Sequence, residues 1–139
     1  MFSLLLSIPI IYDHTDTETS GINDHAYEPT TTVIPLNNKI AIEKTILYFH
    51  APEEPNHYWG YVEGKITNHV PDFAVVIVMF NEEEIFPRFS QVDVNENGYY
   101  EYKFRVKNIH DGELVWKMEG DYRITIFKVV HLDPKSSFL

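Results

Sequence analysis

Apolar and polar residues alternate in short runs between Tyr58 and Val130, and Gly, Pro and Asn-Gly positions separate these runs. A period of two is typical of a strand with one buried face, whereas helices show a period of 3.6. In the clearest strand, the apolar positions are Tyr100, Tyr102, Phe104 and Val106, and the charged positions are Glu101, Lys103 and Arg105. Repeated short strands of this kind predict an all-β, antiparallel β-sandwich of about seven strands.

Turn residues and prolines indicate how the strands connect. Gly98 supplies the positive φ of a tight turn, so Asn97-Gly98 is expected to form a hairpin between its flanking strands. The near-continuous apolar run Phe73–Phe80 is typical of a central strand covered on both faces. Pro87 restricts the following strand to a sheet edge or a bulge. Residues 39–49 fit either a strand or a helix, and their β-branched side chains favour the strand.

Composition shifts divide the chain into three parts. Residues 1–32 combine an apolar run (1–12) with a polar, Thr-rich linker, residues 33–132 form the predicted sandwich, and residues 133–139 form a tail. The apolar run has the length of a signal-peptide core, although no basic residue precedes Lys39. Export to the cell envelope or the extracellular space is therefore expected, and the alternative is an N-terminal strand or a segment packed on the sandwich. The chain has no second hydrophobic segment, so no transmembrane anchor is predicted.

Charge and cysteine usage exclude several function classes. The net charge is −10, from 21 acidic and 11 basic residues. Such a balance argues against binding to nucleic acid or to an anionic membrane, since both require clustered Lys and Arg. With no cysteine, the chain has no disulfide, thiolate metal site or Cys nucleophile.

Two sets of residues are candidate metal ligands. Asp93, Asn95 and Asn97 before Gly98 match the opening of a calcium loop, but the position of the bidentate Glu holds Phe104. The hairpin explains the same residues without an ion.

Imidazole ligands suit copper or zinc in a protein without cysteine. Of the seven His residues, His50 and His57 flank a proline loop and are the best candidates to converge. The alternative is that loop histidines are solvated polar residues.

No catalytic motif is present, so we expect a protein that is not an enzyme. Serine never occurs in a G-x-S-x-G context, and the acidic runs Glu53-Glu54 and Glu82–Glu84 lie on predicted loop tips. Tyr58, Trp59 and Tyr61 form a candidate aromatic platform for a sugar or a peptide. The alternative for Trp59, as for Trp116, is a core position between two sheets.

The order of the structural motifs resembles a known family. These motifs are Gly60–Ile66, Pro71–Ile77, Gln91–Tyr102 and Trp116–Ile126. They are similar to the small Ig-like, fibronectin-III-like modules of exported and cell-surface proteins of archaea, notably ammonia-oxidising ones. The resemblance implies an Ig-like sandwich, and because turn glycines and core aromatics carry it, it implies little about activity.

The leading hypothesis is a non-enzymatic, exported β-sandwich for protein binding or assembly at the cell surface. An edge strand would pair with a protein partner or with a second copy of the chain. The alternative hypothesis is a His-based copper- or zinc-binding protein of the cell envelope.

Overall fold

The computed structural model describes residues 10–13, 29–84 and 86–132, and these residues form antiparallel β-structure without a helix. The all-β prediction is confirmed. The strands are β1 (Ile10–Asp13), β2 (Thr30–Pro35), β3 (Ile40–His50), β4 (Trp59–Lys65), β5 (Val75–Phe80), β6 (Arg88–Val92), β7 (Tyr99–Arg105), β8 (Lys107–His110), β9 (Glu113–Lys117) and β10 (Asp121–His131). No helix in these residues has the length and hydropathy needed to cross a membrane.

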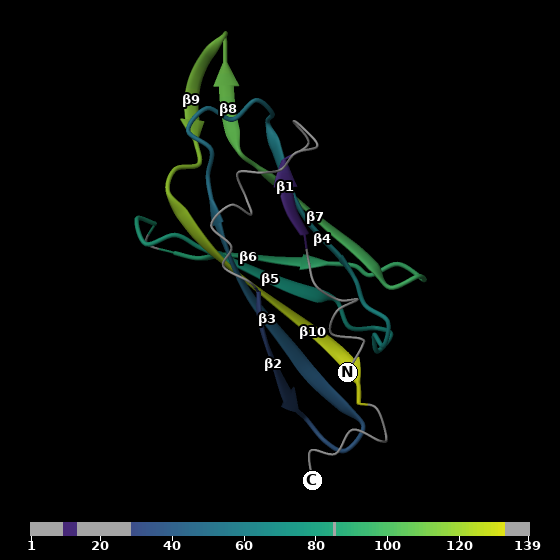
Figure 1. Cartoon of the computed structure of the whole chain (residues 1–139). Helices are drawn as coiled ribbons and strands as arrows, with labels where there is room; N and C mark the ends of the chain where they lie inside the picture. The colour runs from purple at the N-terminus through teal and green to yellow at the C-terminus, as the bar shows by residue number, and fades with distance from the viewer. Residues whose placement is uncertain (1–9, 14–28, 85, 133–139) are drawn as a thin grey trace.

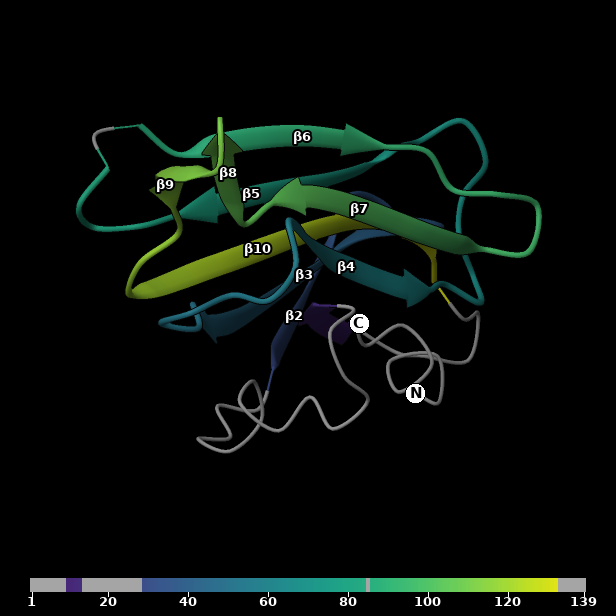
Figure 2. The ribbon, with the colours of Figure 1, turned by 90° about the horizontal axis from the view of Figure 1, so that it is seen from above.

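The strands form a large sheet, a small sheet and a separate hairpin (Figure 1). The large sheet has the order β2-β3-β10-β5-β6, and the small sheet has the order β1-β4-β7. Seen from above, β4 and β7 cross in front of the large sheet as a second layer (Figure 2). The hairpin of β8 and β9 extends beyond one end of both sheets.

The core lies between the large and the small sheet. Its centre is the long β3–β10 pair, which stays in register from Ile40↔His131 to His50↔Asp121. Buried and partly exposed residues alternate along both strands, so one face of the large sheet is turned inward. Phe49 of the large sheet and Phe104 of the small sheet meet edge to face, with ring centroids 6.1 Å apart.

Two glycines of β4 make room for aromatic side chains of β7. Gly60 lies opposite Phe104 and Gly64 lies opposite Tyr100 in the strand register. A Cβ at Gly60 would lie 2.5 Å from the Phe104 ring, and a Cβ at Gly64 would lie 2.6 Å from the Tyr100 hydroxyl. The large aromatic rings of β7 therefore fold across the bare backbone of β4, which explains why these strand positions are glycine.

The hairpin predicted at Asn97-Gly98 is wrong, because β6 pairs with β5 and β7 pairs with β4. The segment between β6 and β7 crosses from the large sheet to the small sheet instead. Gly98 does have positive φ (84°), as the sequence indicates. A turn alone does not decide which strands pair: Tyr100 and Phe104 of β7 are buried in the core, and Val92 of β6 packs against that core from the other sheet.

Other sequence predictions are confirmed in this structure. The segment predicted at 39–49 forms one uninterrupted strand, Ile40–His50, and Pro87 directly precedes the edge strand β6. Tyr100 and Phe104 are buried, whereas Lys103 and Arg105 are exposed. The end of the apolar N-terminal run forms β1, which pairs with β4. The rest of that run lies outside the described residues, and export stays a prediction.

Candidate functional site

The outer face of the large sheet carries apolar side chains on all five of its strands. Side chains alternate between the two faces of each strand, and those that do not point into the core form this outer face. All of them keep some solvent exposure. Thr125, Val78 and Phe89 follow one another in register across β10, β5 and β6, and Ile46 of β3 continues the row. The apolar members of this outer face are Ile34, Ile40, Ile42, Ile46, Tyr48, Val76, Val78, Phe80, Phe89, Phe127 and Val129.

Exposed apolar side chains occur on three strands of this face, and Tyr48 of β3 is 48% exposed. Phe89 of β6 is 71% exposed and Ile34 of β2 is 44% exposed. Central positions such as Val78 and Phe127 are half-buried, because neighbouring side chains on a sheet shield one another. No other element of the described chain covers this face, although the apolar run Phe73–Phe80 predicted coverage on both sides.

The charge on the outer face differs from that of the whole chain. Lys44 and Arg123 are its interior charged residues, and Arg123 lies 5.0 Å from the centroid of the Phe80 ring. The carboxylate on this face is that of Asp121, which lies at the end of β10 and is 2.6 Å from Nδ1 of His50. In a chain with net charge −10, this face is apolar with a slight positive charge.

The three aromatic residues predicted as a platform lie on or beside the outer face of the small sheet. Trp59 is not a core residue, because Lys103 and Arg105 lie over its ring at 4.1 and 4.6 Å from the centroid. Tyr58 is 45% exposed and lies 5.8 Å from Arg105. Two cations thus contact the Trp59 ring, and binding of a sugar or a peptide at these three residues stays a prediction. Trp116, in contrast, packs against the core.

The predicted metal ligands are not assembled in the described part of the chain. His50 binds Asp121, and His57 is exposed on the loop before β4. Among the described residues, no three His, Asp or Glu side chains converge on a point that could hold an ion. Copper or zinc binding stays a prediction.

A hollow of about 830 Å³ at one end of the sandwich is lined by the calcium candidates Asp93, Asn95 and Asn97. The Asn95 side-chain oxygen accepts hydrogen bonds from the backbone N–H groups of Asn97 and Tyr99, both at 2.9 Å. Those two bonds use both lone pairs of the oxygen and hold the crossing segment between the sheets. The calcium hypothesis stays a prediction, and Asn95 already has a structural role.

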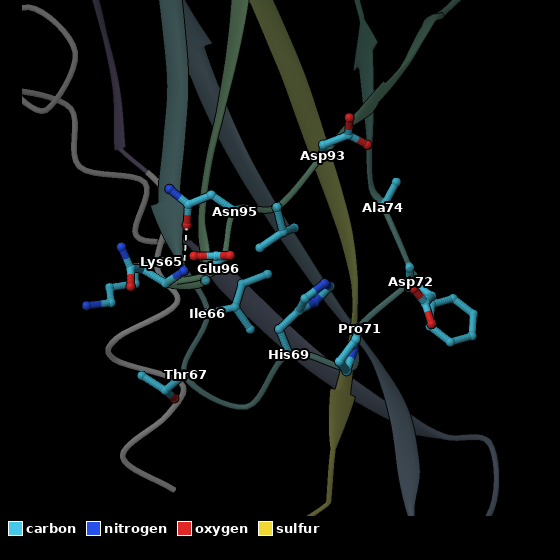
Figure 3. A pocket seen from close by; sticks show the side chains of 14 residues that line it. Lys65, Ile66, Thr67, His69, Pro71, Asp72, Ala74, Asp93, Asn95 and Glu96 are labelled. Carbon is cyan, nitrogen blue, oxygen red and sulfur yellow. Dashed lines mark hydrogen bonds between the residues drawn. The ribbon is translucent and has the colours of Figure 1, made fainter.

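His69 lies in the same hollow, between Ile66 and Pro71 (Figure 3). Its Nδ1 is buried and has no hydrogen-bond partner among the described residues. Burial lowers the pKa of His69, and backbone carbonyls of Val129 and Phe73 oppose this shift. The imidazole is therefore neutral at neutral pH.

Sequence reasoning missed a charged pair inside the core. Glu43 of β3 and Lys128 of β10 are register partners, 2% and 1% exposed, with Nζ and Oε1 3.4 Å apart. Burial lowers the pKa of Lys128, and the charge of Glu43 opposes this shift. Strand alternation in the sequence could have revealed this position, because Lys128 lies on the same face of β10 as the buried residues Ile126 and Val130.

The chain matches no protein-family model, and neither a curated protein nor a solved structure is similar enough to identify a relative. Function must therefore be inferred from the surfaces described above.

Proposed function

We propose that this protein is a non-enzymatic β-sandwich that binds a partner protein through the outer face of its large sheet. One observation carries the proposal: the face is apolar across five strands, and nothing in the described chain covers it. Contiguous exposed apolar surface of this kind is typical of protein interaction sites.

The size of the face fits a stable interface. The five strands have 6, 11, 11, 6 and 5 residues, and at about 3.3 Å per residue and about 4.8 Å between strands they cover roughly 600 Å². A standard interface buries about 800 Å² on each partner. The face thus supplies most of the area of one standard interface.

Charge identifies the chemistry of the partner. Lys44 and Arg123 would be desolvated on binding, and each would need a carboxylate opposite it. Two copies of the face docked on each other would instead bring cations together without added carboxylates at the centre. The proposed partner is therefore a folded protein with an apolar patch flanked by Asp or Glu.

The cellular setting belongs to the same proposal. An apolar N-terminal run followed by a polar linker supports export, and the acidic, cysteine-free composition is compatible with it. Two packed antiparallel sheets also support, at the level of architecture, the resemblance to Ig-like modules of cell-surface proteins. Protease treatment of intact cells tests this setting, since an exposed chain is digested and a cytoplasmic chain is protected.

Site-specific photo-crosslinking tests the binding face. A benzophenone amino acid replaces Phe89 on the face, and in a matched control it replaces Leu114, which is 54% exposed on the β8–β9 hairpin. We expect one discrete adduct with another protein from position 89 in the native cells and none from position 114. The change Val78→Glu should abolish the adduct.

Three results would overturn the proposal. Equal labelling at positions 89 and 114 would mean random collision. An adduct made only with a second copy of the chain would exclude the acidic partner. Absence of any adduct at position 89, with the protein folded and present at its native level, would mean that the face is not an interface.

A further inference from the structure

The strand β7 leaves one edge of the small sheet without a strand partner in the described part of the chain. Val106 N–H donates to Tyr58, and the Gly98 carbonyl accepts from Ile66, so even-numbered residues of β7 turn their backbone groups toward β4. The alternation of an antiparallel ladder then places the N–H and C=O groups of Glu101, Lys103 and Arg105 on the open edge. An unpaired row of this kind can accept an added strand.

Two cations, Lys103 and Arg105, follow this edge at alternate positions, and a third, Lys107, continues the row on β8, where β9 is the strand partner. Lys103, Arg105 and Lys107 occupy every second position, which is a spacing of about 6.8 Å along an extended chain. The rings of Trp59 and Tyr58 interleave with them, and Lys107 lies 5.3 Å from the Tyr58 centroid. Each of the three cations therefore contacts an aromatic ring.

This row has no carboxylate counterpart among the described residues. The ion pairs among the described residues all involve other cations. Lys103 and Arg105 are exposed, and their charged groups lie against aromatic rings. Lys107 donates to the Pro55 carbonyl at 2.6 Å. In a chain with nearly twice as many acids as bases, an unneutralised row of cations along an open strand edge indicates an anionic ligand.

We propose that the β7 edge binds an extended acidic segment of a protein, which adds as a further strand to the small sheet. Asp or Glu at alternate positions of that segment would match the spacing of Lys103 and Arg105, because both chains are extended. Backbone hydrogen bonds to Glu101, Lys103 and Arg105 would supply affinity, and the charge pairs would select the sequence. This site is separate from the outer face of the large sheet and goes beyond the function proposed above.

Fluorescence anisotropy with designed peptides tests the site on the intact chain. The probe is a fluorescein-labelled eight-residue peptide in which Glu alternates with Val and Thr. One control peptide has the same composition with its Glu residues in a single block, and another carries N-methyl groups on the amides that would face β7. We expect the alternating peptide to bind saturably, the block peptide to bind at least about tenfold more weakly, and N-methylation to abolish binding.

Protein variants locate the site. The double change Lys103→Glu and Arg105→Glu should weaken binding about tenfold or more, since two favourable cross-strand charge pairs become repulsive. The matched control is Lys39→Glu with Arg123→Glu, which makes the same charge change at exposed positions outside the small sheet. That control should leave binding within about twofold of the parent chain.

The outcomes separate this proposal from the previous one. Phe89→Asp, on the outer face of the large sheet, should leave peptide binding unchanged, so either proposal can fail alone. If the block and N-methylated peptides bind as well as the alternating one, the attraction is diffuse and no strand is added. If no peptide binds at low ionic strength to a chain whose circular dichroism shows intact β-structure, the cations only protect the edge from pairing.

Discussion

Replacing Lys128 by Met removes the ammonium that faces Glu43 in the core. The two residues are register partners on β10 and β3, and both are almost fully buried. The Lys128 ammonium also lies 5.9 Å from the centroid of the Tyr100 ring, so the pair connects the two sheets. The substitution tests whether a charged pair really occupies the centre of the sandwich.

The expected loss follows from burial. Removing one member of a buried ion pair costs about 3–5 kcal/mol, because the remaining charge keeps its desolvation penalty. A loss of about 3 kcal/mol corresponds to a fall in Tm of roughly 10 °C for a chain of this size. The double change Glu43→Leu with Lys128→Met removes both charges, and its unfolding free energy should lie close to the parent value or up to about 4 kcal/mol above it.

Urea unfolding at pH 7, followed by tryptophan fluorescence, gives the four free energies of this cycle. The matched control is Lys65→Met, an exposed lysine on β4, for which we expect a change within about 0.5 kcal/mol. A loss of less than about 1 kcal/mol for Lys128→Met would refute the reasoning. So would a double variant that loses as much as the two single variants combined, since the two charges would then not act as a pair.

Three further predictions concern the core and the crossing segment. Burial, and next the charge of Glu43, raise the pKa of Tyr100, so native stability should fall as pH rises above about 10, where the unfolded tyrosine ionises. Tyr100→Phe should reduce that fall in urea titrations from pH 8 to 11, and at pH 7 it should change stability by less than about 1 kcal/mol, because the hydroxyl has no described partner. Gly60→Ala should cost about 1–3 kcal/mol through its clash with the Phe104 ring, and Phe104→Leu should restore part of the loss in the same urea assay. Gly98→Ala should lower Tm more than Gly120→Ala, because both glycines have positive φ but only a Cβ at Gly98 would meet the Ile66 carbonyl. The fall in Tm for Gly98→Ala should be the same in EDTA and in calcium. Equal falls in Tm for the two variants would contradict this packing.

Local pattern predicted the strands because side-chain parity is a local property. The alternation at Tyr99–Arg105 identified which side chains face the core, and the positive φ of Gly98 followed from its turn context. Even the buried Lys128 shares the parity of Ile124 and Ile126, so the sequence contained the signal for a charged core position. Charge alone made that position easy to assign to the surface.

Pairing between distant strands could not be predicted in the same way. The turn before β7 fits a hairpin equally well, but β6 joins the large sheet and β7 joins the small sheet, where Tyr100 and Phe104 enter the core. The candidate surfaces depend on this arrangement. Phe89 and Val78 become neighbours through the β5–β6 pairing, and Lys103 meets Trp59 through the β4–β7 pairing.

Hydroxyl-radical footprinting tests the central claim, which is that a partner protein covers the outer face of the large sheet. The side chains Phe89 and Ile34 on the face, and Leu114 on the hairpin as the reference, are all well exposed in the isolated chain. Oxidation is measured by mass spectrometry in the purified protein and in its native cells. We predict that Phe89 and Ile34 become strongly protected in cells relative to Leu114. Equal oxidation of all three residues in both settings would contradict the account.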